Sequence, residues 1–242
     1  MIWYFINRIF YEVYAIGDLL LIRYHFLICS SLIVILAAIN YLGAKSSNLP
    51  WLPRFMLFLF IAMIFGFLGD FLLGNFLNIP IEPLLLGVPA FFVGHIFYLL
   101  ALRTQSPLLF KSPEASPQGS STLIRRNLLV LIGFNIIGLI LFFTTIYNPS
   151  QLILGMGFLV YGLFFLSVLA FAFTKLLGKR VPEARQEFFF YLGLLLFFAS
   201  DYILGINRFT LPILFASLII HGFYLPGQLF IHLSPVFLQI IE

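Results

Sequence analysis

The chain has 242 residues, of which 62% are apolar and only 9% charged, with a formal net charge of +4. An ordinary soluble domain carries about half apolar and about a quarter charged residues, and even a large one buries only about three quarters of its unfolded surface. No water-soluble fold can hide this much apolar surface. The 13 Lys and Arg residues are scattered over short loops, so no nucleic-acid-binding face is expected. The composition indicates an integral membrane protein, an all-α polytopic bundle of transmembrane helices.

Seven segments are long and apolar enough to cross a bilayer, which takes about 20 apolar residues. In chain order they cover residues 26–43, 54–75, 84–102, 127–146, 151–174, 187–206 and 211–233. An N-terminal segment, 3–22, has the length of an eighth span but carries Arg8, Glu12 and Asp18. It either crosses the membrane with those charges facing protein or lies in the interface as an amphipathic helix. We favour eight spans in a single domain, 1–242.

The basic residues are distributed unevenly between the two sides of such a bundle. Because consecutive spans alternate in direction, one side holds ten of the 13 and the other holds Arg8, Arg23 and Arg208. The ten are Lys45, Arg54, Arg103, Lys111, Arg125, Arg126, Lys175, Lys179, Arg180 and Arg185. By the positive-inside rule the richer side is cytoplasmic and includes the C-terminus. We expect a multi-pass protein of a bacterial inner (plasma) membrane, with the Ser- and Pro-rich connection 103–126 as a flexible cytoplasmic loop.

Two acidic residues lie in the interior of the seven spans, whereas Glu187 stands at the first residue of one. Asp70 (FGFLGDFLLG) and Asp201 (LFFASDYILG) are each embedded in apolar sequence. An aspartate at the centre of a span costs about 2.5 to 3.5 kcal/mol, so such residues usually face the bundle interior and mark a site. At about 1.5 Å per residue, the two lie about 24 and 21 Å from the cytoplasmic ends of their spans. We therefore expect both carboxyls at one level, in the outer half of the membrane.

Small and polar residues accompany the two acids. Gly66 shares a helix face with Asp70, and Gly193 shares one with Asp201, which lets neighbouring backbones approach closely. The candidates for substrate binding or support are His95, Tyr98, Arg208, His221, Tyr224 and Gln228. Taken singly, most of these are ordinary interhelical hydrogen-bonding residues, and Arg208 at a helix end has the position of a snorkelling anchor. Two acids at matched depth favour a functional site.

Several kinds of membrane protein use buried carboxyls. Two neighbouring carboxyls in a buried site do not both ionise, because their negative charges repel. One stays neutral and the other is a carboxylate, so the pair supplies a general acid and a general base. An aspartyl intramembrane protease would carry Gly-x-Gly-Asp, whereas this chain has Gly66-Phe-Leu-Gly69-Asp70 and no Pro-Ala-Leu element. A zinc hydrolase would cluster histidines, but His221 and His232 are about 16 Å apart along a helix. A proton-coupled transporter with the aspartates as relay stays open, although a short chain without a visible repeat is less typical of one.

An ordered set of motifs resembles the YhhN family of lysoplasmalogenases. The set comprises Gly69-Asp70 with Leu73, Gly94-His95 with Tyr98, Ser200-Asp201 with Arg208-Phe209, and Tyr224 with Gln228, over about residues 25–233. The resemblance implies eight spans and hydrolysis of the vinyl ether bond of a lysoplasmalogen, which gives a fatty aldehyde and a glycerophospho-base. It also implies a role for two membrane aspartates, matched here by Asp70 and Asp201, with a lysophospholipid in the bilayer as the substrate.

This chemistry suits the residues. Protonation of the alkene carbon creates an oxocarbenium ion, which water captures to form a collapsing hemiacetal. As in glycoside cleavage, one acid and one carboxylate suffice, and no metal or other cofactor is required. We expect one of Asp70 and Asp201 to donate the proton and the other to stabilise the cation and orient water. His95 and Tyr98 are expected to fix the carboxyls or the water, and Arg208, about 10 Å along the helix from Asp201, to hold the phosphate.

Overall fold

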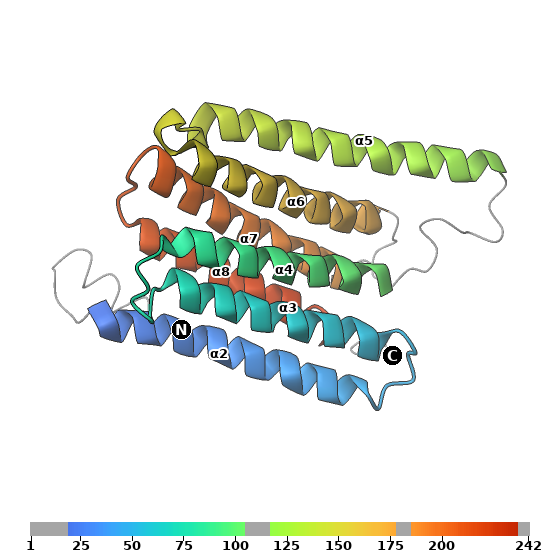
Figure 1. The fold of residues 1–242 in the computed structure, drawn as a ribbon. Coiled ribbons are helices and arrows are strands. Elements are labelled where there is room, and N and C mark those ends of the chain that lie inside the picture. The colour runs from blue at the N-terminus through green and yellow to red at the C-terminus, as the bar shows by residue number, and fades with distance from the viewer. Residues whose placement is uncertain (1–18, 105–116, 178–184, 237–242) are drawn as a thin grey trace.

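The computed structural model describes residues 19–104, 117–177 and 185–236, and every regular element in these ranges is a helix (Figure 1). The long helices are α2 (Leu19–Ala44), α3 (Leu52–Leu73), α4 (Pro83–Thr104), α5 (Pro117–Leu141), α6 (Leu152–Leu177), α7 (Arg185–Phe209) and α8 (Ala216–Leu233). A π-helical turn, η1 (Phe142–Ile146), and a 3-10 turn, η2 (Pro149–Gln151), connect α5 to α6. Within the described residues, seven helical segments are long and apolar enough to cross a membrane. The expected polytopic all-α bundle is confirmed.

The helices reproduce the seven expected spans, but three of them start five or more residues from the expected position, and the first of these, α2, begins at Leu19 instead of 26. The connection 103–126 is shorter on both sides, since α4 continues to Thr104 and α5 begins at Pro117. Hydropathy marks only the part of a helix in the hydrocarbon core, so it misses polar turns outside that core; proline is also well suited to a first helical turn. The last span begins at Ala216 instead of 211, because the apolar residues before it form a connection.

The N-terminal segment 3–22 lies outside the described residues except for 19–22, which form the first turn of α2. An eighth span therefore stays a prediction.

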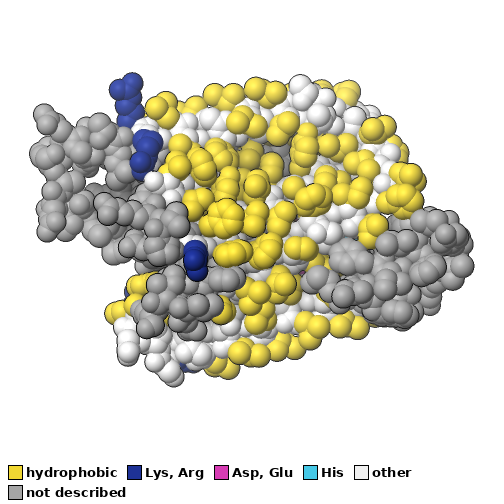
Figure 2. Space-filling view, turned by 180° about the vertical axis from the view of Figure 1, so that it is seen from behind, with side chains coloured by type: hydrophobic (Ala, Val, Ile, Leu, Met, Phe, Trp, Pro, Cys, Tyr) yellow, Lys and Arg dark blue, Asp and Glu magenta, His cyan; other side chains and the backbone are white. Residues whose placement is uncertain are grey.

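The helices run side by side along the bundle axis (Figure 1). Two antiparallel pairs, α3 with α4 and α7 with α8, make the most extensive contacts. α2 packs against α3 and α8, while α6 packs against α4 and α7 and carries α5 on its other side. On the face shown in Figure 2, hydrophobic side chains are spread between the two ends of the bundle, and the visible Lys and Arg side chains gather at one end. This is the surface of a protein surrounded by lipid.

Glycines permit close contacts between helices in the pairs that carry the two acidic residues. A Cβ on Gly193 of α7 would lie 2.7 Å from the carbonyl oxygen of Gly227 on α8. A Cβ on Gly69 of α3 would meet the ring of Phe91 on α4 at 2.7 Å. The contact at Gly193 is with backbone, which only glycine permits, and a side chain at Gly69 would require the Phe91 ring to move. Asp70 follows Gly69 directly, so its backbone lies in a tightly packed part of the α3–α4 pair.

Candidate active site

Asp70 lies near the C-terminal end of α3, with 4% of its surface exposed. Its Oδ2 atom accepts two hydrogen bonds, one from Ser30 Oγ of α2 at 2.6 Å and one from the Tyr224 hydroxyl of α8 at 2.8 Å. The other carboxyl oxygen, Oδ1, has no hydrogen-bond partner among the described residues. Side chains from three helices thus meet at this carboxyl and fix its orientation.

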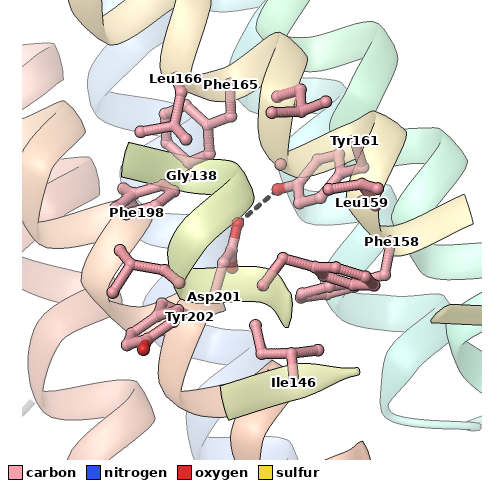
Figure 3. A pocket seen from close by; sticks show the side chains of 14 residues that line it. Gly138, Ile146, Phe158, Leu159, Tyr161, Phe165, Leu166, Phe198, Asp201 and Tyr202 are labelled. Atoms are coloured by element: carbon pink, nitrogen blue, oxygen red, sulfur yellow. Dashed lines mark hydrogen bonds between the residues drawn. The ribbon is translucent and has the colours of Figure 1, made fainter. Parts of the chain in front are cut away.

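Asp201 of α7 is held in a similar way and has 8% of its surface exposed. The Tyr161 hydroxyl of α6 donates a hydrogen bond to Asp201 Oδ2, and Figure 3 shows the two side chains pointing at each other. The same hydroxyl lies 3.4 Å from Nε2 of His95 on α4. A buried polar chain therefore runs from His95 through Tyr161 to Asp201. Each of the two carboxyls thus accepts a hydrogen bond from a tyrosine hydroxyl at one of its oxygens.

A cavity of about 440 Å³ joins the two acids. Both Asp70 and Asp201 line it, together with His221 and Tyr224 of α8. The cavity lies toward the end of the bundle that carries the α3–α4 and α7–α8 connections, at the left in Figure 1. Its volume is in the range of small-molecule sites, so both carboxyls can face one bound molecule.

An ion pair stands at the edge of this cavity. Arg208, near the end of α7, and Glu82, just before α4, both line the cavity. Arg208 Nη2 lies 2.9 Å from Glu82 Oε2, and Arg208 Nε lies 3.3 Å from Glu82 Oε1. About a third of each side chain is exposed. A partly exposed pair of this kind contributes little to stability. Breaking it to bind a charged ligand would therefore cost little free energy.

Tyr98 and Gln228 do not line the cavity. The Tyr98 hydroxyl donates to Gln228 Oε1 at 2.7 Å, and both side chains are buried deeper between α4 and α8. His95 reaches Asp201 through Tyr161, whereas Tyr98 makes no hydrogen bond with either acid among the described residues. That His95 and Tyr98 fix the carboxyls or the water stays a prediction. The helical repeat indicates which face a residue occupies but not the side chain it meets across the bundle.

His221 lies on the cavity wall, as expected for a substrate-binding candidate. Its ring stacks on Phe26 of α2 with 4.1 Å between ring centroids, and its Nδ1 atom is 3.5 Å from Ser217 Oγ. In the described part of the chain, no group of three or more His, Cys, Asp or Glu side chains is placed to hold a metal ion. The polar groups on the cavity wall are thus carboxyls, hydroxyls, one imidazole, an amide and one ion pair.

The model of the YhhN family matches residues 23–235, which is most of the chain. This protein belongs to the YhhN family. The resemblance inferred from the motifs is thereby confirmed. The matched range contains every residue of the cavity described above. No match was found among curated proteins or among solved structures.

Three residues of this YhhN protein's site were missed by the sequence analysis. Ser30 and Tyr161 hold the acids, and Glu82 pairs with Arg208. Hydroxyl side chains are common in membrane-spanning helices, because burying one costs much less free energy than burying a charge. Neither Ser30 nor Tyr161 therefore stands out in one sequence. Glu82 lies between the expected spans 54–75 and 84–102, in a connection, where acids are ordinary. Its 126-residue separation from Arg208 gives no sign of their contact.

Proposed function

We propose that this YhhN protein hydrolyses the vinyl ether bond of lysoplasmalogen-type lysophospholipids to a fatty aldehyde and a glycerophospho-base. The observation that carries the proposal is the presence of Asp70 and Asp201 on the wall of one cavity inside a membrane bundle. The Oδ2 atom of each carboxyl accepts a hydrogen bond from a tyrosine hydroxyl. The Oδ1 atom of each has no hydrogen-bond partner among the described side chains. Two such groups supply the acid and the base that vinyl ether hydrolysis requires.

The reaction needs one neutral carboxyl group and one carboxylate. The neutral group protonates the alkene carbon that does not carry oxygen, and the ether oxygen shares the resulting positive charge. The carboxylate stabilises this cation, then accepts a proton from a water molecule that adds to the carbon bonded to oxygen. The hemiacetal so formed collapses when the carboxyl that took the water proton gives it to the glycerol oxygen and the bond from that oxygen to carbon breaks. The hemiacetal hydroxyl becomes the aldehyde carbonyl and returns its proton to the carboxylate that began as the acid. One water is consumed, and the proton balance between Asp70 and Asp201 is restored.

The polar end of the substrate fits the edge of the cavity. Arg208 offers a guanidinium group, which binds phosphate oxygens in a bidentate manner. Glu82, its partner at 2.9 Å, offers a carboxylate for the positively charged amine of an ethanolamine or choline headgroup. On binding, the Arg208–Glu82 ion pair would be replaced by two ion pairs with the lipid, Arg208 with its phosphate and Glu82 with its amine. The edge of the cavity is thus complementary to a zwitterionic headgroup.

The experiment that tests this function is an assay of aldehyde release in D2O. Purified protein given lysoplasmenyl-ethanolamine with a chelator should release a fatty aldehyde with deuterium at the carbon next to the carbonyl, because that carbon receives the solvent-exchanged proton. A matched lysolipid with a saturated ether chain should not be cleaved, since it has no alkene to protonate. Absence of aldehyde from the vinyl ether substrate would refute the proposal, and loss of activity with chelator would point to a metal hydrolase.

A proton-coupled transporter is the second candidate, and one observation favours it. Tyr224, Gln228 and His232 follow one another at intervals of four residues on α8, and all three are buried. Gln228 Nε2 and His232 Nε2 have no hydrogen-bond partner among the described residues. Buried polar atoms of this kind attract water, so the series resembles a proton path from Asp70 toward the other end of the bundle. Proton-dependent flux in liposomes, without aldehyde release, would favour transport.

The charge distribution supports an orientation for this site. We propose that the end of the bundle rich in Lys and Arg faces the cytoplasm, so that the cavity opens in the outer half of the membrane. Asn78, an exposed residue of the α3–α4 connection, is then outside. A cysteine at position 78 should react with a membrane-impermeant maleimide on intact cells. Protection until the cells are lysed would reverse the orientation.

A further inference from the structure

A second large cavity lies between α4 and α6, with a volume of about 400 Å³. Its walls are apolar: Val88 and Phe92 of α4 face Ile153 and Val160 of α6. Gly157 of α6 also lines it and has no side chain to fill it. We call this space the α4–α6 groove. It differs from the cavity of the two acids in having almost no polar group on its walls.

The groove borders the cavity of the acids. Leu84, in the first turn of α4, lines both spaces, so the two spaces adjoin at this residue. Tyr161 lines the groove, and its hydroxyl donates to Asp201, which lines the cavity. The residue that orients one acid is therefore also part of the groove wall. A molecule can contact both spaces only if one part of it is polar and the other apolar.

The proposed substrate has this shape. Its vinyl ether joins a glycerophospho-base on one side to a hydrocarbon chain on the other. When the vinyl ether lies between Asp70 and Asp201 and the phosphate reaches Arg208, the chain has to leave the cavity in another direction. A third cavity, between α5, α6 and α7, borders Asp201 (Figure 3) but has a volume of only about 40 Å³. That space holds a few water-sized groups, so it is too small for a lipid chain.

We propose that the α4–α6 groove binds the hydrocarbon chain of the lipid substrate, with Leu84 at its entrance and Gly157 on its wall. The inference rests on the proposed function and adds to it the site that selects chain length. The groove is of the size and apolarity that a long chain requires. Its contact with the cavity through Leu84 and Tyr161 distinguishes it from an ordinary lipid-facing surface.

Gly157 provides a direct test. A Cβ added at Gly157 meets no atom within 4 Å, so Gly157→Leu and Gly157→Phe should fold while filling the groove. With a long-chain substrate kcat/KM should fall by about tenfold, the scale of a steric overlap in an apolar site. With a short-chain substrate, which does not extend past the new side chain, kcat/KM should stay at the wild-type value. Gly133→Leu on α5, where a Cβ also meets nothing within 4 Å, is the matched control and should change neither value. Equal losses for both chain lengths, or no loss at all, would overturn the proposal.

A binding experiment separates this proposal from the proposed function. A lysophospholipid with a photoreactive diazirine in its chain should label α4 and α6 residues of the groove. Excess saturated alkyl lysolipid should compete with the labelling, and Gly157→Phe should abolish it. Uniform labelling of all lipid-facing helices without competition would mean ordinary contact with membrane lipid and refute the groove. Because labelling needs no turnover, it decides the groove even if the wild-type protein releases no aldehyde, a result that refutes the proposed function alone.

Discussion

The Tyr161 hydroxyl on α6 donates a hydrogen bond to Oδ2 of Asp201 on α7. The same hydroxyl lies within 3.4 Å of His95 Nε2. Tyr161 is thus the link between a buried histidine and one of the two acids in the cavity. In the proposed reaction Tyr161 is a positioning residue, which acts through Asp201.

Tyr161→Phe removes this link and keeps the ring. We expect kcat for aldehyde release to fall by about ten- to a hundredfold, because a proton donor or acceptor misplaced by a small distance loses much of its effect. KM should change little, since the hydroxyl contacts Asp201 and not the substrate's polar end. Tyr202→Phe is the matched control: its hydroxyl bonds to Thr145, and it does not line the cavity of the acids. Equal activity of the two variants would remove Tyr161 from the account.

The hydroxyls of Ser30 and Tyr224, which both donate to Asp70, are expected to be partly redundant in orienting its carboxyl. Ser30→Ala removes one donor and should reduce kcat severalfold, while Tyr224 still holds the carboxyl. The double variant Ser30→Ala/Tyr224→Phe should lose more than the product of the single effects, because Asp70 then has no side-chain donor among the described residues. Ser31→Ala serves as control, since the Ser31 hydroxyl bonds to its own helix at the carbonyl of Leu27. Strict additivity would indicate that the two donors act independently.

The ion pair at the edge of the cavity should determine the choice of headgroup. Arg208→Gln should raise KM about tenfold for every phosphate-bearing substrate, because it removes a charge-assisted hydrogen bond. Glu82→Gln should raise KM for ethanolamine and choline headgroups but not for a substrate that ends in phosphate alone. Arg103→Gln, at the other end of the bundle, is the control for loss of a positive charge. Unchanged headgroup preference in Glu82→Gln would show that this pair is structural only.

The sequence is sufficient to predict the seven long helices and to single out the two acids within them. A bilayer requires long apolar helices, and a carboxyl in such a helix is costly enough to be conspicuous in one sequence. The common depth of Asp70 and Asp201 followed from the helical rise, and the structure places both on one cavity wall.

The partners of the acids could not be predicted in this way. Ser30 and Tyr161 lie on α2 and α6, which carry no described acid. A hydroxyl in a span costs too little free energy to mark its position as a site. Which helix faces reach Asp70 and Asp201 depends on packing across the bundle. The glycine contact between Gly193 and Gly227 is one example, because it brings α7 and α8 together at a point that hydropathy does not reveal.

The most direct measurement is aldehyde release by Asp70→Asn and Asp201→Asn. The substitutions keep the shape of the side chains, so both variants should retain wild-type thermal stability in detergent and the same elution on size exclusion. Each should lower aldehyde release by about a thousandfold, the scale of losing general acid or base catalysis. Folded variants that still release aldehyde at the wild-type rate would contradict the central claim that these two carboxyls carry out the reaction.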